Sequence, residues 1–67
     1  MTFRLIFKEQ SELRDIPREK YTINDLLNDL KLPNQTIVAK INDEIAVEEA
    51  EINENDEIKL IQIIYGG

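Results

Sequence analysis

The stretch that decides the fold is 57-EIKLIQIIYGG-67, an apolar run followed by two glycines. Isoleucine and leucine dominate the run, which is typical of a buried strand. Gly66 and Gly67 are the only glycines in the chain. Glycine usually marks turns and helix ends, so its absence from every predicted turn indicates a different purpose here. We therefore expect a strand over residues 57–65 that presents a glycine tail.

The N-terminal half of the chain predicts two strands. Residues 2–8 alternate, with Phe3, Leu5 and Phe7 on one face, as in a half-buried strand. Residues 9–11 are polar and typical of a turn. A second strand is expected over residues 12–17, with a bulge or an irregular edge because its apolar residues fall on opposite faces.

The middle of the chain predicts a helix and a hairpin. Apolar residues recur at helical spacing over residues 21–32, with Thr22 as the cap and Pro33 ending the run. Strands are expected over residues 36–41 and 44–47. Asn42-Asp43 joins them, because both residues tolerate the positive φ of a tight turn.

One helix covers only one face of a sheet. The simplest closure is a mixed sheet of four to five strands wrapped around the apolar stripe of the helix, with the first and last strands parallel in the centre. This is the α+β architecture called the β-grasp, or ubiquitin-like, fold. We expect residues 1–64 to form this domain and residues 65–67 to be a flexible C-terminal tail.

Both faces of the last strand are apolar. Its two sides carry Ile58, Leu60, Gln62 and Ile64, and Lys59, Ile61, Ile63 and Tyr65. Because a helix would cover only the first set, the surplus predicts an exposed partner patch near the tail. The patch comprises Ile6, Ile61, Ile63 and Tyr65. The alternatives are that the face assignment slips by one residue near Ile61, or that these side chains cover one another.

Composition excludes several kinds of site. The 67 residues include no cysteine and no histidine, which rules out disulfides, cysteine nucleophiles, Cys/His zinc sites and histidine acid–base catalysis. The net charge of −6 disfavours nucleic acid and favours a basic protein partner. The start of the chain resembles neither a signal peptide nor a membrane span, so we expect a cytoplasmic protein without a membrane partner.

The acidic side chains form no predicted site. The largest group is Glu48, Glu49, Glu51, Glu54, Asp56 and Glu57. This run lacks the ligand pattern of a calcium loop, so a solvated surface is favoured and no metal is expected. Asp25 and Asp29 lie one helical turn apart, but capping explains the first and exposure the second better than catalysis does.

Three segments resemble the small prokaryotic ubiquitin-like sulfur carriers. They are Ile41-Asn42-Asp43-Glu44-Ile45, Glu54-Asn55-Asp56-Glu57-Ile58 and Gly66-Gly67. The chain is similar over nearly its whole length to the thiamine-pathway carrier, the small subunit of molybdopterin synthase and their archaeal modifier relatives. That family commonly has glycine in the two turns, where this chain has Asp43 and Asn55, residues that replace glycine best at positive φ.

The resemblance implies a protein co-substrate rather than an enzyme. In this family an ATP-dependent, ubiquitin-activating-like enzyme adenylates the terminal carboxylate, which corresponds to Gly67. A sulfur donor then converts it to a thiocarboxylate for cofactor biosynthesis or tRNA thiolation. Tyr65, Gly66 and Gly67 are expected to enter the activating enzyme, and the acidic surface would steer docking. No cofactor is expected to bind the chain itself, and a synthase large subunit is a further expected partner.

Two other functions stay open at this point. A protein modifier would use the same activation and end in an isopeptide bond between Gly67 and a target lysine. A plain β-grasp binding module would leave the tail without a role. Independently of the resemblance, a terminus without side chains suits a narrow channel, because glycine adopts backbone angles closed to other residues. Three extended residues reach roughly 10 Å into such a channel.

Overall fold

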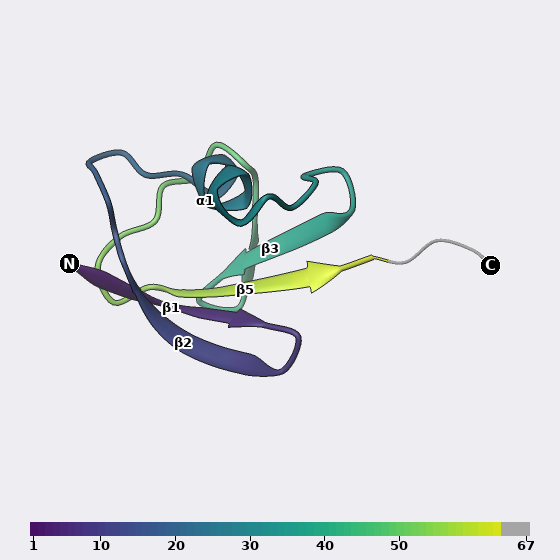
Figure 1. Ribbon diagram of the computed structural model, residues 1–67, viewed down its shortest axis with the longest axis horizontal. Coiled ribbons are helices and arrows are strands. Elements are labelled where there is room, and N and C mark those ends of the chain that lie inside the picture. The colour runs from purple at the N-terminus through teal and green to yellow at the C-terminus, as the bar shows by residue number, and fades with distance from the viewer. Residues whose placement is uncertain (64–67) are drawn as a thin grey trace.

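The computed structural model describes residues 1–63 of the chain, which form one sheet and a helix (Figure 1). In chain order the elements are β1 (Thr2–Phe7), β2 (Gln10–Asp15), α1 (Ile23–Leu30), β3 (Ile37–Ile41), β4 (Glu44–Ala46) and β5 (Glu57–Gln62). The expected tail, 65–67, lies outside the described residues, as does the last residue of the expected domain.

The sheet has the order β2-β1-β5-β3-β4. β1 and β5 are parallel and central, with Leu5 opposite Ile58, while every other neighbouring pair is antiparallel. Two hairpins flank a parallel central pair, and α1 lies in the connection between them. The predicted β-grasp fold is therefore confirmed.

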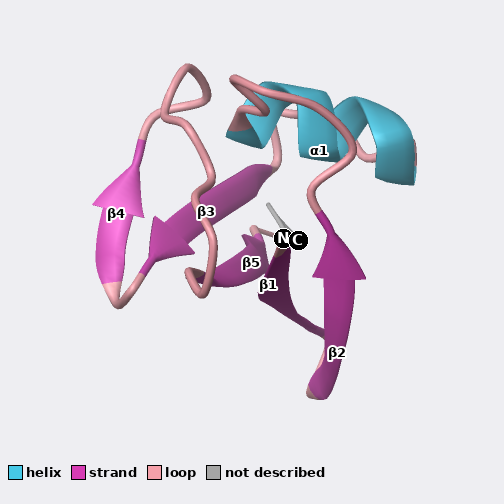
Figure 2. Cartoon of the chain, turned by 90° about the vertical axis from the view of Figure 1, so that its left-hand side faces the viewer, coloured by secondary structure: helices cyan, strands magenta, loops and turns pink. Residues whose placement is uncertain are grey.

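Figure 2 shows α1 lying over one face of the sheet, and the buried core residues come from both. Strand residues that point to the helix alternate with exposed ones, and Ile58 of β5 is fully buried, as is Leu26 of α1. The buried cluster is Phe3, Leu5, Tyr21, Ile23, Leu26, Leu27, Ile37, Ala39, Ile52, Ile58 and Leu60. The predicted inward face of residues 2–8 is confirmed for Phe3 and Leu5, and Phe7 packs at the margin of the core.

The helix begins with a complete capping box. The Thr22 hydroxyl accepts a hydrogen bond from the Asp25 amide at 3.2 Å, and the Asp25 carboxylate accepts one from the Thr22 amide at 3.1 Å. The helix ends at Leu30, with Lys31 left-handed at φ 59°. The prediction of residues 21–32 was too long at both ends, because Thr22 caps the helix from outside and Lys31 turns the chain before Pro33.

The first hairpin corrects two predictions. Its turn is Lys8-Glu9, with φ values of 52° and 65°, so β2 starts at Gln10 rather than at residue 12. The register of β1 and β2 is continuous from Thr2↔Asp15 to Phe7↔Gln10, so the bulge expected in β2 is absent. Leu13 is exposed on the sheet surface and Ile16 follows the strand. The bulge was predicted because Leu13 and Ile16 would fall on opposite faces of one strand. Since Ile16 lies outside β2, no bulge is needed.

The two turns that carry the family resemblance adopt the expected geometry. Asn42 and Asp43 have φ values of 52° and 72°, and Asn55 has 68°. The Asn42 side chain also joins the hairpin to the start of β5, since its amide donates to Asp56 at 3.0 Å and its oxygen accepts from the Glu57 amide at 3.0 Å. The Asn42 side chain thus ties the turn between β3 and β4 to the start of β5.

Candidate functional site

The candidate site is the outer face of the sheet, the face turned away from α1. Within residues 1–63 no helix packs against this face (Figure 2). Ile6 of β1 lies opposite Lys59 of β5, and Ile61 follows two residues later on the same side. Ile6 is half-buried and Ile61 is 37% exposed. The structure thus places these two members of the predicted patch on neighbouring strands of one exposed face.

The other two predicted patch residues lie at or beyond the end of β5. The Ile63 amide donates to the Thr36 carbonyl at 2.8 Å, which continues the ladder with β3 by one step. Strand alternation therefore puts Ile63 on the same face as Ile61. Tyr65 lies outside the described residues, and so do Gly66 and Gly67.

Sequence reasoning missed three apolar residues on this face. Val38 of β3 lies directly opposite Ile61. Ile45 of β4 lies opposite Lys40 and is 77% exposed, and Leu13 of β2 lies opposite Arg4 and is 64% exposed. Strand alternation could have predicted Val38 on this face, because its neighbours Ile37 and Ala39 point inward. Ile45 and Leu13 needed the registers of both hairpins.

The end of β5 lies at the sheet end away from the N-terminus. β5 runs parallel to β1, so Leu60 lies beside Phe7, next to the turn at Lys8-Glu9. Figure 1 shows β5 pointing away from the N-terminus. Within the described residues, β5 therefore ends at the same end of the sheet as the turn between β1 and β2.

Comparisons with known proteins agree with this geometry. The ThiS family matches residues 5–67. The chain belongs to the ThiS family. It is thus a ubiquitin-like protein of the sulfur-carrier type, and the predicted family is confirmed. Members of this kind act as carriers or modifiers rather than catalysts.

Two solved structures resemble the ThiS-family chain in fold. SAMP1 from Haloferax volcanii is 16% identical with a TM-score of 0.74, and the match covers 100% of each chain. A ubiquitin-like protein from the hyperthermophilic archaea Caldiarchaeum subterraneum is 15% identical with a TM-score of 0.65, covering 98% of this chain and 100% of the other. A search among curated protein sequences found no match to this chain.

The outer face has two lysines next to the apolar patch, although the chain as a whole is acidic. Lys59 of β5 lies opposite Lys40 of β3, and Arg4 of β1 lies two residues before Ile6 on the same face. The acidic run instead lies mostly in the connection between β4 and β5, where Glu48 accepts at its carbonyl from the Asn24 amide of α1. Lys40 and Lys59 therefore border the apolar patch on a protein of net charge −6, while Arg4 lies opposite Glu57.

The two helix carboxylates have structural partners. Asp25 completes the capping box and also lies 3.2 Å from the Arg18 guanidinium. The hydrogen bond from the Thr22 amide is the main cause that lowers the pKa of Asp25. Asp29 accepts a hydrogen bond from the Tyr21 hydroxyl, and burial together with this bond raises the pKa of Tyr21. Both carboxylates are thus used in folding.

Residues 1–63 contain neither a cluster of metal-binding side chains nor a membrane-spanning helix. In that part of the chain no three histidine, cysteine, aspartate or glutamate side chains gather where they could hold a metal ion. Nor does any helix there have the length and apolar composition to cross a membrane.

Proposed function

We propose that this ThiS-family chain is a sulfur carrier whose Gly67 carboxylate receives the sulfur. An ATP-dependent activating enzyme joins that carboxylate to the α-phosphate of ATP, releasing pyrophosphate. Sulfide-level sulfur from a donor then attacks the acyl carbon, the bond to the phosphate oxygen breaks with AMP leaving, and the product is a thiocarboxylate for cofactor biosynthesis or tRNA thiolation. The observation that carries the proposal is the family match over residues 5–67, which includes both glycines. ATP is a substrate of the partner, and the reaction belongs in the cytoplasm.

The composition of the last residues supports this chemistry. A carboxylate is a poor acyl donor, so it needs activation in a nucleotide pocket of another protein. Gly66 and Gly67 have no side chains to obstruct entry, and Tyr65 is the last bulky residue before them. The folded domain stays outside the pocket while these residues enter it.

The outer face supports a docking role beside that tail. Ile6, Ile61 and Ile63 provide apolar area on the exposed face, and Lys40 and Lys59 border it. Exposed apolar groups rimmed by charge are typical of protein contacts. The activating enzyme, and after it a synthase large subunit, would contact this patch with an apolar surface that has an acidic rim.

The reaction can be followed by intact mass. The chain, its cognate activating enzyme, ATP and a sulfur donor should give a mass increase equal to the difference between sulfur and oxygen. A chain without Gly66 and Gly67 should show none, because its terminal carboxylate then belongs to Tyr65, whose side chain would obstruct entry into the nucleotide pocket. The absence of any shift in the full chain, with an enzyme preparation shown to adenylate another carrier protein, would refute the proposal.

A second candidate is a protein modifier. The same acyl-adenylate reacts with a lysine amine, with AMP leaving and an isopeptide bond forming. Trypsin cuts after Lys59, so conjugates would carry residues 60–67 as a remnant on target lysines. Finding such remnants in lysates with a tagged chain would support this role. Complementation of a knockout by the chain without its glycines would instead support a plain binding module.

A further inference from the structure

Among residues 1–63, β2 is an edge strand that no further strand of the sheet pairs with on its outer side. It stands at the end of the order β2-β1-β5-β3-β4 and has six residues, twice as many as β4 at the opposite edge. Figure 2 shows β2 at the margin of the sheet. Five of its residues are exposed and Arg14 is half-buried. A long regular edge without proline or a bulge is a template for pairing with another strand.

The backbone groups on that edge can be identified from the hairpin register. The Ile16 amide donates to the Met1 carbonyl at 2.9 Å, so Met1 and Ile16 form a hydrogen-bonded pair. Such pairs alternate along an antiparallel ladder, which places Phe3↔Arg14, Leu5↔Glu12 and Phe7↔Gln10 in the same class. The amides and carbonyls of Ser11, Leu13 and Asp15 therefore point away from β1.

The side chains of β2 are complementary to their own reverse. The sequence Ser11-Glu12-Leu13-Arg14-Asp15 is centred on Leu13, with a carboxylate before it and a guanidinium after it. We infer that β2 pairs with β2 of a second copy, antiparallel and centred on Leu13. Leu13 then meets Leu13 of the second copy, and Ser11 meets Asp15. Each Glu12 lies opposite Arg14 of the other copy, so two identical ion pairs form across a two-fold axis.

Charge also selects this register. A shift that pairs Ser11 with Leu13 keeps the backbone bonds but puts Glu12 opposite Glu12. A shift that pairs Leu13 with Asp15 puts Arg14 opposite Arg14. Like charges directly opposite one another destabilise a sheet, so the centred register is favoured over both neighbours.

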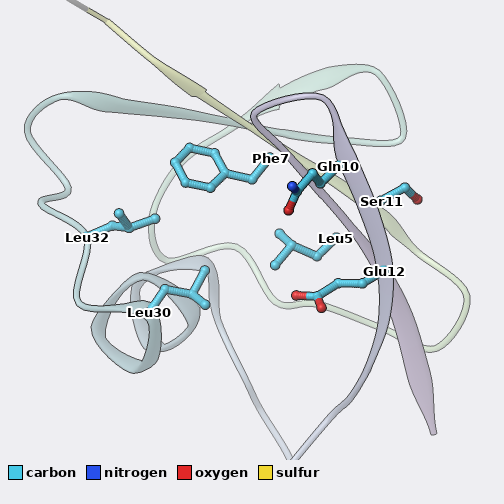
Figure 3. A pocket seen from close by; sticks show the side chains of 7 residues that line it. All are labelled: Leu5, Phe7, Gln10, Ser11, Glu12, Leu30 and Leu32. Atoms are coloured by element: carbon cyan, nitrogen blue, oxygen red, sulfur yellow. The ribbon is translucent and has the colours of Figure 1, made fainter.

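The surroundings of Glu12 are consistent with this pairing. Glu12 borders an open cleft of about 490 Å³ between the first hairpin and the end of α1, whose apolar floor includes Leu5, Phe7 and Leu30 (Figure 3). The aliphatic stem of the incoming Arg14 can lie along this apolar margin while its guanidinium reaches Glu12. In one copy alone, Glu12 and Arg14 form a 3.2 Å ion pair that is largely exposed, so exchanging it between copies loses little.

The two-fold axis has a consequence for the carrier. It reverses strand direction, and β5 is parallel to β1, so the β5 strands of the two copies point in opposite directions. Pairing at β2 thus leaves both β5 ends free for a partner. A single strand pair buries less than the roughly 1,200 Å² of stable complexes, so the dimer is weak and reversible.

Sedimentation equilibrium up to about 1 mM chain tests the inference. The natural chain should show a monomer–dimer equilibrium. Glu12→Arg and Arg14→Glu should each weaken it about tenfold, because both symmetric pairs become repulsive. The double variant E12R/R14E should restore it, since opposite charges again face each other. Glu54→Arg, which alters net charge equally to Glu12→Arg but lies in the turn before β5, should leave the dimer intact.

A second variant keeps the test decisive if a charge reversal affects folding. Leu13 is 64% exposed, so Leu13→Lys should retain a dispersed amide NMR spectrum and abolish the dimer by placing two ammonium groups face to face. A monomer at about 1 mM would overturn the inference. A dimer that responds equally to Glu12→Arg and Glu54→Arg, or that the double variant fails to restore, would overturn it as well.

Discussion

The two faces of the sheet differ most clearly within β5. Ile58 and Ile61 are the same residue type three positions apart, yet Ile58 is fully buried under α1 and Ile61 is 37% exposed on the outer face. Alternation along one strand thus divides its side chains between two tasks. Inner residues stabilise the domain, and outer residues are available to partners.

The largest expected effect is on the inner face. Ile58→Ala removes fully buried atoms, so the free energy of unfolding should fall by about 2–5 kcal/mol. This is a large share of the stability of so small a domain. Urea denaturation followed by circular dichroism measures the change. A loss below about 1 kcal/mol would contradict the comparison, because burial on the inner face would then contribute little to the free energy of unfolding.

The next effect concerns the helix that covers the inner face. Thr22→Ala removes the capping hydroxyl that accepts from the Asp25 amide and should cost about 1 kcal/mol. Thr36→Ala, outside the helix, is the matched control and should change stability by less than about 0.5 kcal/mol. Thermal denaturation of both variants gives the comparison. Equal losses of stability in the two variants would show that the Thr22 cap does not stabilise α1.

Tyr21, whose hydroxyl donates to Asp29 of α1, makes a pH-dependent contribution to the free energy of unfolding. Its buried hydroxyl donates to Asp29, and Tyr21→Phe should cost about 1 kcal/mol near neutral pH. The pKa of Tyr21 is raised in the folded state above its ordinary value of 10.0. Above that pH the unfolded chain loses the proton while the folded chain keeps it, so the stability gained from Tyr21 is full below pH 10.0 and falls as pH rises further.

Urea titrations of both chains between neutral and alkaline pH test this sign. The natural chain should lose its advantage over Tyr21→Phe as the pH rises above 10.0. A gap between the two chains that stays constant or widens would contradict a protonated Tyr21 in the folded state.

The smallest effect on stability is expected on the outer face. Ile61→Ala should change the free energy of unfolding by less than about 1 kcal/mol, because the side chain is already partly exposed. It should raise the KM for the carrier in activation by its enzyme, with kcat little changed. Steady-state pyrophosphate release measures both constants. An unchanged KM would remove Ile61 from the proposed docking surface.

Much of the fold could be predicted from sequence because local rules and tertiary packing agree. Thr22 and Asp25 specify the helix start, and Asn42-Asp43 suits its turn by tolerating positive φ. The first turn could not be placed, because Lys8 and Glu9 adopt positive φ without being residues that favour it. Its correct position depends on the pairing of β1 with β2.

The candidate site was only partly predictable for the same reason. Alternation within one strand was sufficient to find Ile61. Grouping it with Ile6 also needed the neighbour relation of β1 and β5, while Ile45 and Leu13 required the registers of the two hairpins. The cationic border was missed because net charge averages over the surface, whereas Lys40 and Lys59 meet only through the β3–β5 register.

The measurement closest to the central claim is the mass of the tryptic peptide of residues 60–67, taken from native cells after alkylation to trap thiocarboxylates. The account predicts a fraction of this peptide in which one oxygen of Gly67 is replaced by alkylated sulfur. Peptide found solely with an ordinary carboxylate, in cells whose known carriers are thiolated in the same sample, would contradict the assignment of Gly67 as the sulfur-bearing residue.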